Sequence, residues 1–182
     1  MTSKAGPFRR IPLREVIRIA AWIPVGIFFT RNVYSLAHIT GVSMQPTFNP
    51  NLSTSPLHHD VVLLERWSIR MHQYRRGDVV TLWSPQNPDV LTTKRVVAFE
   101  GDLVTPLPPS APTPIRIPPG HAWVEGDSHY DSLDSNTYGP IPLGLINSRV
   151  TYILWPFTRF SPVVNGLGKA KGRVRKFTGE VF

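Results

Sequence analysis

Hydrophobic positions in the first third of the chain are concentrated in one run. Residues 19–30 read IAAWIPVGIFFT, and no charged side chain occurs between Arg18 and Arg31. These twelve residues are fewer than the roughly 20 that a membrane-spanning helix needs. Both flanking arginines can extend toward a membrane surface, so we predict one helix over residues 16–35. Pro24 would kink this helix without preventing it.

The rest of the chain alternates short apolar runs with turn residues, a pattern that is typical of β-structure. Several runs are rich in β-branched residues, and most begin after aspartate, glycine or proline. The sequence predicts strands at 60–64 (DVVLL), 77–83 (GDVVTLW), 90–99 (VLTTKRVVAF), 121–125 (HAWVE) and 143–154. We therefore predict a mainly β fold.

Two segments have neither the period of a helix nor the alternation of a strand. Residues 103–119 contain seven prolines, which favours an extended and exposed connection over a helix. The segment after residue 162 is rich in glycine and lysine, and we expect it to be weakly ordered. The chain has no internal repeat and no glycine-rich phosphate loop.

Composition limits the class of protein. A chain of 182 residues with 41% hydrophobic content can bury one core with a small appendage. Nineteen prolines are too many for a helical bundle. Because the chain has no cysteine, it forms no disulfide and has neither a thiolate nucleophile nor a cysteine-ligated metal.

The net charge of +8 lies entirely at the two ends of the chain. Residues 1–18 and residues 169–182 each carry five basic side chains against one glutamate. Between them, ten basic side chains balance ten acidic ones, so the body lacks the positive charge that a phosphate backbone requires. We expect no nucleic-acid binding. The basic ends suit anionic lipid or an acidic partner, and a solvated tail explains residues 169–182 equally well.

The same charges orient the predicted helix. Five basic residues precede the apolar run, so the positive-inside rule puts the chain beyond about residue 35 across the membrane. An Arg-rich, acid-poor start is also typical of an organelle-targeting sequence, which leaves a removable or peripheral segment as the alternative. We divide the chain into a basic N-terminus (1–15), a transmembrane anchor (16–35), a β domain (36–160) and a basic tail (161–182).

Two residues suggest nucleophilic chemistry. Ser43 lies in the turn-prone stretch TGVSMQPT, and a loop serine becomes a nucleophile only beside a base. Lys94 lies in the middle of the predicted strand at 90–99, where burial would lower the pKa of its amine toward a usable range. Taken alone, Lys94 is interpreted as an ordinary strand lysine.

Four sequence blocks change that interpretation. GVSMQPT, RRGDVV, TKRVVAFEGD and EGDSHYDSLDSNTYGP occur in this order at 41–47, 75–80, 93–102 and 125–140. Together they resemble the type I signal peptidase family. The resemblance implies a signal-peptidase-like β-barrel or sandwich catalytic domain with one N-terminal transmembrane helix. It further implies a serine endopeptidase without a cofactor, in which Ser43 is the nucleophile and Lys94 the general base.

Within the family, the stretch DSNTYGPIPLGLI at 134–146 is similar to the mitochondrial inner membrane peptidases, and among these it more closely resembles subunit 2. Other members more often have arginine where this chain has Asn136. This resemblance implies a single-pass protein of the mitochondrial inner membrane whose catalytic domain faces the intermembrane space. Its partners would be the membrane, a sister catalytic subunit and precursor proteins with intermembrane-space sorting signals. A bacterial or plastid-type signal peptidase is the alternative.

The resemblance assigns supporting roles to further residues. Asp127, Ser132 and Asp134 match the family's box beside the dyad, with Ser132 orienting the lysine amine; an Asx-stabilised turn is the alternative for the aspartates. Some bacterial members have an oxyanion-binding serine where this chain has Gly41. The oxyanion would then depend chiefly on backbone donors, first the N–H of Ser43.

The substrate would lie beside the serine. Residues 36–40 read LAHIT and form a predicted edge strand, which an extended peptide can join by β-augmentation. We predict that Ile39 and Met44 bind the substrate and that Ile39 lines a pocket for small side chains. Packing of Ile39 in the core is the alternative.

Two other functions fit parts of the sequence. Six histidines allow a Ser-His-Asp hydrolase with Asp127 or Asp131, but neither G-x-S-x-G nor H-E-x-x-H occurs. We predict no metal site. A membrane-tethered β domain without activity, serving as a scaffold, is the remaining alternative.

Overall fold

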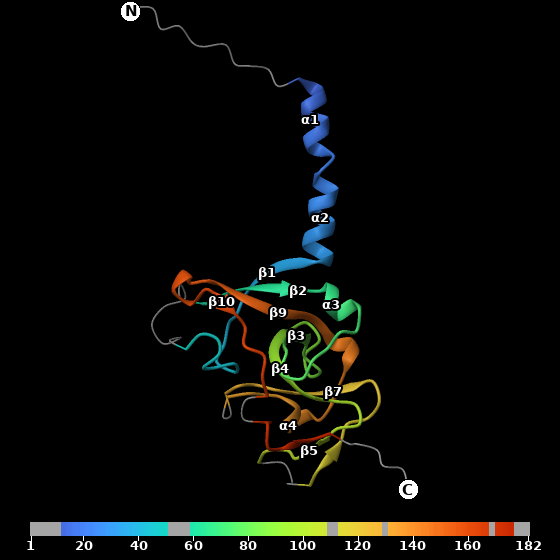
Figure 1. The fold of residues 1–182 in the computed structure, drawn as a ribbon, viewed down its shortest axis with the longest axis vertical. Helices are drawn as coiled ribbons and strands as arrows, with labels where there is room; N and C mark the ends of the chain where they lie inside the picture. Colours follow the sequence, from blue (N-terminus) through green and yellow to red (C-terminus); the bar gives the residue numbers. More distant parts are fainter. Residues whose placement is uncertain (1–11, 51–58, 109–112, 129–130, 168–169, 177–182) are drawn as a thin grey trace, which may run out of the picture.

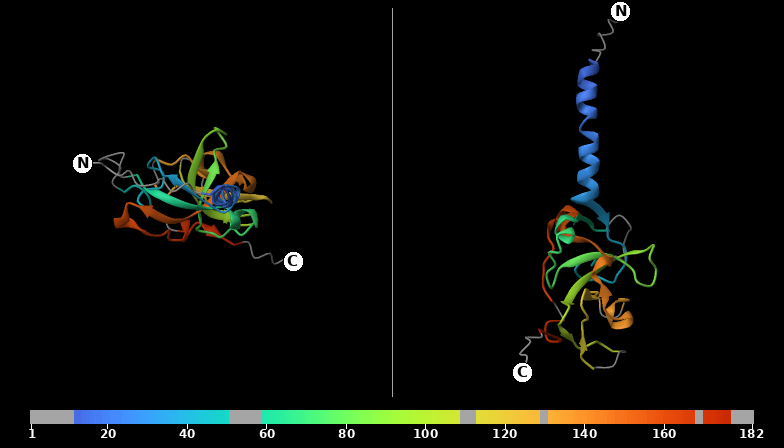
Figure 2. Two further views of the ribbon diagram at one scale, coloured as in Figure 1. Left: turned by 90° about the horizontal axis from the view of Figure 1, so that it is seen from above. Right: turned by 90° about the vertical axis from the view of Figure 1, so that its right-hand side faces the viewer.

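Two helices stand end to end on a β-rich body (Figure 1). They are α1 (Leu13–Ala20) and α2 (Ile23–Asn32), and they project from the end of the body that carries the first strand (Figure 2). The computed structural model describes residues 12–50, 59–108, 113–128, 131–167 and 170–176. Within these ranges, no helix has both the length and the apolar character needed to cross a membrane.

The expected continuous helix over residues 16–35 is wrong at two points. Pro24 lies in the first turn of α2 and has no backbone N–H, and its ring would clash with the carbonyl of Ala20 in an unbroken helix. Ala20 is the last residue of α1, so the helix breaks where proline requires it. At the other end, the chain has already left the helix at Tyr34, where the first strand begins.

One antiparallel sheet forms most of the body, which confirms the predicted mainly β fold. Its order is β1-β2-β9-β3-β4-β7-β8, with β10 paired to β9, and it curls as a half-barrel (Figure 1). The strands are β1 (Tyr34–His38), β2 (Val61–Glu65), β3 (Val79–Trp83), β4 (Leu91–Phe99), β7 (His121–Glu125), β8 (Ile141–Pro142), β9 (Ile146–Trp155) and β10 (Ser161–Pro162).

The five predicted strands all occur, with small changes at their ends. The largest change is at the last one, where residues Leu143–Leu145 form a 3-10 turn and β9 begins only at Ile146. Buried and partly buried residues alternate along the first half of β9, as expected when one face of a strand packs on the core. Strand β1 lies at the edge of the sheet, as predicted for residues 36–40.

A second, three-stranded sheet corrects two expectations. Its order is β11-β5-β6, from β5 (Leu103–Val104), β6 (Ile115–Arg116) and β11 (Val174–Arg175). The proline-rich connection therefore supplies two short strands, and the tail supplies the third. Val104, Ile117 and Ala170 are buried against Trp123. The described part of the tail packs on the body because its apolar residues complete this cluster.

Short helices connect the strands. They are α3 (Trp67–Arg70), α4 (Ser135–Tyr138) and the 3-10 turn η3 (Phe157–Arg159). Helix α3 lies at the base of α2, where the Arg66 guanidinium donates to the carbonyl of Thr30. Helix α4 directly follows Asp134 and packs beside β7, which brings this helix next to the candidate site.

Candidate active site

Lys94 lies in the middle of β4, between β3 and β7. Its side chain is almost fully buried, with 3% of the residue exposed. The amine Nζ donates a hydrogen bond to the Ser132 Oγ at 2.9 Å. Burial lowers the pKa of the Lys94 amine below its ordinary value, and the Asp134 carboxylate offsets part of this change. A neutral amine held by a hydroxyl is suited to accept a proton.

Ser43 approaches this pair through the backbone of another segment. The Ser43 carbonyl accepts a hydrogen bond from the Ser128 N–H at 3.0 Å. A Cβ placed on Gly126 would lie 2.2 Å from the Ser132 Oγ and 2.4 Å from the Ser43 carbonyl oxygen. Both atoms therefore lie against the same point of the Gly126 backbone. The structure brings Ser43, Ser132 and Lys94 into one neighbourhood from three distant parts of the sequence.

Gly41 begins the turn that carries Ser43. Its φ of +96° lies in the left-handed region, which glycine adopts without steric cost and other residues rarely adopt. Open space surrounds the position where its Cβ would be. Backbone conformation, rather than close packing, therefore explains glycine at the position where some bacterial relatives have serine.

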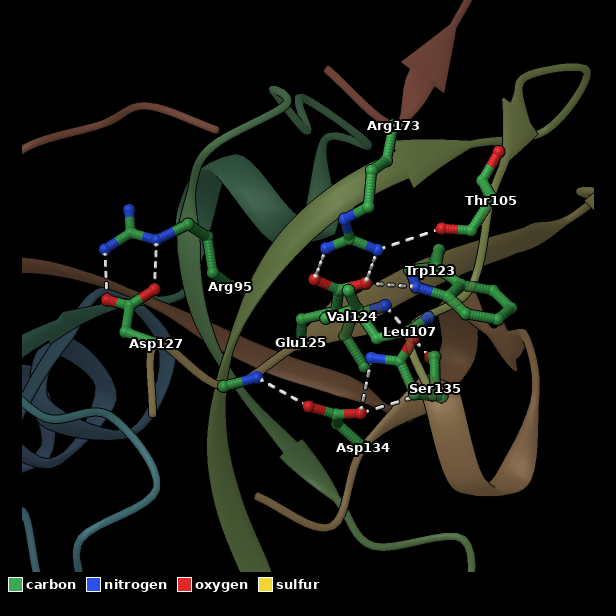
Figure 3. Close-up of polar contacts among 12 residues, drawn as sticks. Arg95, Thr105, Leu107, Trp123, Val124, Glu125, Asp127, Asp134, Ser135 and Arg173 are labelled. Carbon is green, nitrogen blue, oxygen red and sulfur yellow. Dashed lines mark hydrogen bonds and ion pairs between the residues drawn. The ribbon is translucent and has the colours of Figure 1, made fainter. Parts of the chain in front are cut away.

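Asp134 connects α4 to the segment around Gly126 (Figure 3). Its carboxylate caps α4 by accepting from the Asn136 N–H at 3.0 Å, and it also accepts from the Gly126 N–H at 3.0 Å. Burial of Tyr138 raises the pKa of its hydroxyl, and the negative charge of Asp134 adds to this increase. The Asx-type cap that the sequence left open for the aspartates is present at Asp134.

Asp127 has a different set of contacts. Both of its carboxylate oxygens accept from the Arg95 guanidinium, at 2.8 and 2.6 Å (Figure 3). The Thr47 hydroxyl also donates to it at 2.5 Å. Arg95 donates in addition to the Gly77 carbonyl at 2.9 Å. This network ties the segment after β7 to the turn after Ser43, so Asp127 holds the shape of the site.

The two residues predicted to bind substrate lie largely in the core. Ile39 is 6% exposed and Met44 is 2% exposed, and both belong to one hydrophobic cluster with Phe48 and Val62. Core packing, the alternative considered for Ile39, accounts for most of both side chains. Within the described ranges, no group of three or more histidine, aspartate or glutamate side chains could hold a metal ion. His58 and His129 lie outside these ranges.

A buried ion pair beside the site has no signal in the sequence. Glu125, the last residue of β7, accepts two hydrogen bonds from the Arg173 guanidinium and one from the Trp123 indole N–H (Figure 3). A cavity of about 460 Å³ lies next to it and is lined by Asp127 and Leu167 among others. In the sequence, Arg173 is only one of five basic residues in the tail.

Comparisons with known proteins identify the family of the chain. The family model described as "Signal peptidase, peptidase S26" matches residues 13–107. The chain is 43% identical over 152 residues to the mitochondrial inner membrane protease subunit 2 of Schizosaccharomyces pombe, covering 84% of this chain and 82% of the relative. It is 45% identical over 138 residues to the protein of the same name from Mus musculus, covering 76% and 77%.

A relative with a different subunit name is also similar. The mitochondrial ATP-independent inner membrane protease subunit 1b of Arabidopsis thaliana is 34% identical over 178 residues, which cover 90% of this chain and 97% of the relative. These similarities confirm the resemblance to the signal peptidase family that the four sequence blocks indicated. They also confirm the closer resemblance to the mitochondrial inner membrane peptidases.

Proposed function

Because the chain belongs to the signal peptidase, peptidase S26 family, we propose that it is a serine endopeptidase in which Ser43 attacks the scissile peptide and Lys94 is the general base. The observation that carries this proposal is the buried Lys94 amine, which donates to the Ser132 hydroxyl at 2.9 Å. An ordinary lysine is protonated at neutral pH and cannot accept a proton. Burial lowers the pKa of the Lys94 amine and so favours the neutral form that can accept a proton.

In the first half of the reaction, neutral Lys94 takes the proton of the Ser43 hydroxyl while Oγ attacks the carbonyl carbon of the substrate. The resulting ammonium then gives this proton to the leaving amine as the peptide bond breaks, which leaves an ester on Ser43. In the second half, Lys94 takes a proton from water, and the hydroxide attacks the ester. The proton returns to the Ser43 oxygen, so the enzyme is regenerated and one water is consumed.

Backbone N–H groups stabilise the negative charge that develops on the carbonyl oxygen of the substrate. We assign the Ser43 N–H as the first oxyanion donor, since Gly41 offers no hydroxyl. Ser132 has the role of holding the Lys94 amine in one direction. Asp134 and Asp127 fix the segment that supports Ser132 and Ser43, through the hydrogen bond from the Gly126 N–H and the Arg95 ion pair.

An extended peptide is the substrate that suits the sheet. Among the strands of the described residues, β1 pairs only with β2 and lies at the edge of the sheet, so its other side can receive a peptide strand. Ile39 follows this strand and Met44 follows Ser43. We propose that the small exposed parts of these two side chains line the position next to the scissile bond. The substrate side chain at this position would be a small one, as expected from the sequence.

The names of the relatives support a place at the mitochondrial inner membrane. We propose that residues 16–35 attach the chain to that membrane, with the basic N-terminus in the matrix and the body in the intermembrane space. The exposed apolar side chains of α1 and α2 support attachment. The substrates would be precursors carrying intermembrane-space sorting signals, and the partner would be a sister catalytic subunit, as the word "subunit" in the relatives' names suggests.

The decisive experiment compares the purified chain with Ser43→Ala. We expect cleavage of a peptide that contains a sorting-signal junction by the original chain, and no cleavage by a Ser43→Ala variant with an unchanged melting temperature. N-terminal sequencing of precursors from cells carrying either form would identify the cleaved bond. Equal processing with and without the Ser43 hydroxyl would favour a non-catalytic scaffold. Release of the chain from membranes by alkaline carbonate would contradict stable membrane attachment.

A further inference from the structure

The carboxylate of Glu125 is nearly saturated by hydrogen bonds, although it is buried. Arg173 donates to its Oε1 at 3.0 Å and to its Oε2 at 2.5 Å, and the Trp123 Nε1 donates to Oε1 at 2.8 Å (Figure 3). Two parallel bonds from one guanidinium fix direction as well as distance. Because Glu125 is the residue before Gly126, this pair acts on the chain where it enters the proposed active site.

Arg173 is itself held by the second sheet. Its guanidinium donates to the Thr105 carbonyl at 3.0 Å, and its own carbonyl accepts from the Thr105 N–H at 3.0 Å. The next two residues form β11, which pairs with β5. Ala170 is buried in the cluster around Trp123. The C-terminal segment 170–176 is therefore a fixed support, and its arginine reaches from that support to Glu125.

The segment after Glu125 has little freedom to absorb a displacement. The Gly126 N–H is bonded to Asp134, the Asp127 carboxylate to Arg95, and the Ser128 N–H to the Ser43 carbonyl. The close approach of Gly126 to Ser43 and Ser132 leaves no gap. A shift of Glu125 must consequently move the surroundings of Ser43.

Packing alone does not hold this connection. The cavity of about 460 Å³ is lined by Ala170 and Arg173 of the C-terminal segment, by Leu167 before it, and by residues 125–127 of the active-site segment. Where side chains do not fill the space between two segments, a directed ion pair has more influence on their separation.

We propose that Arg173 is a positioning residue for the reaction at Ser43, acting through Glu125. The C-terminal segment thus sets the rate of the chemical step without touching the substrate. This inference rests on the proposed function, in which Ser43 is the nucleophile. It predicts that weakening the Arg173–Glu125 pair lowers turnover more than it lowers substrate affinity.

The test compares Arg173→Met with Arg76→Met as a matched control. Arg76 makes an equivalent two-bond pair with a buried carboxylate, Asp102, at 2.7 and 2.9 Å, and none of the hydrogen bonds among the described residues joins this pair to residues 126–128. Each variant is assayed at the same interval below its own melting temperature, so that loss of folded protein does not enter. We expect kcat of Arg173→Met to be about ten- to a hundredfold below that of Arg76→Met, with KM changed by less than about threefold. A kcat within twofold of the control would overturn the proposal.

Arg173→Lys separates charge from geometry. Lysine keeps the positive charge beside Glu125 and should preserve the fold, but it cannot make two parallel hydrogen bonds. We expect its kcat to lie between those of the original chain and Arg173→Met. Full activity in Arg173→Lys would show that charge alone is sufficient and would overturn a positioning role.

Hydrogen exchange gives a readout that needs no activity. The amides of Gly126 and Ser128 are both hydrogen-bonded within the site, so they report directly on this segment. We expect both to exchange at least about tenfold faster in Arg173→Met, with no change in Arg76→Met. If the original chain cleaved no peptide, the proposed function would fail, and exchange would still decide whether Arg173 positions the segment. Equal exchange in the two variants would refute it.

Discussion

Replacing Gly126 by alanine tests the geometry on which the proposed chemistry depends. The added Cβ would lie 2.2 Å from the Ser132 Oγ and 2.4 Å from the Ser43 carbonyl oxygen, whereas real Cβ atoms essentially never come within 3.0 Å of a neighbour. Rotation of the Ser132 hydroxyl does not relieve the clash, because the Ser132 Cβ would also lie 2.6 Å from the added atom. Ser132 must therefore shift, which disturbs its bond to the Lys94 amine. The Ser43 oxygen belongs to the backbone, so the turn carrying the nucleophile must move.

The size of this movement sets the expected loss. Relieving both contacts requires a displacement of at least about half an ångström, and a misplacement of about 1 Å can cost about a hundredfold in rate. We therefore expect kcat of Gly126→Ala to fall about ten- to a hundredfold. Overpacking of this kind costs typically about 1–3 kcal/mol of stability, so the variant should remain folded at 25 °C.

The assay measures cleavage of a sorting-signal peptide together with the melting temperature. Gly144→Ala is the control, since open space surrounds its Cβ position and its backbone is not in the left-handed region. We expect that control to keep kcat within about twofold. A folded Gly126→Ala with undiminished turnover would mean that Ser43 and Ser132 need not keep their present separation, and the reasoning from close approach would be wrong.

Further predictions concern Lys94 and the residues around it. Lys94→Met and Lys94→Arg should each lose at least about a hundredfold in turnover, because neither side chain accepts a proton at physiological pH; a fully active Lys94→Met would exclude the dyad. The same Lys94→Met should unfold at no lower urea concentration than the original chain, since it removes the cost of a buried amine. Activity should rise with pH as Lys94 loses its proton, below the ordinary pKa of 10.5. The unfolded chain binds more protons between the lowered pKa and that value, so Lys94 makes the free energy of unfolding increase with pH in this window, and titration of Lys94→Met should lack this increase. Asn136→Arg should lower the melting temperature, because the Asn136 Oδ1 accepts a hydrogen bond from the Leu107 N–H at 2.7 Å and the arginine side chain has no acceptor. An unpaired N–H costs about 1–3 kcal/mol of stability. An unchanged melting temperature would show that water replaces the amide oxygen.

Strands with a strong local pattern could be predicted from the sequence. Residues 79–83 and 91–99 are rich in β-branched side chains and follow turn residues, and β3 and β4 lie there. The burial of Lys94 could not be inferred in the same way, because its neighbours along β4 are the polar residues Thr93 and Arg95. Its partner Ser132 was indicated by the family resemblance and not by a local pattern.

Other features depend on contacts between distant parts of the chain. Strands β5, β6 and β11 have two residues each, too few for any periodicity, and they exist only because they pair with one another. Arg173 and Glu125 are far apart in sequence, and nothing near either residue indicates the other. The break between α1 and α2 could have been predicted from the sequence, since the Pro24 ring clashes with the carbonyl of Ala20 in a continuous helix. We expected a kinked helix, and the structure has two separate helices.

The junction between α2 and β1 determines how a precursor would meet the enzyme. A single residue, Val33, separates the end of the helix from the start of the edge strand. Arg66 and Arg70 brace this junction by bonding to Thr30 and Asn32. Helix α2 and strand β1 are thus rigidly connected, so a change in the tilt of α2 also reorients β1. The tilt of the helices in a membrane would therefore determine the distance of β1 from the membrane surface and the direction in which a substrate peptide pairs with it.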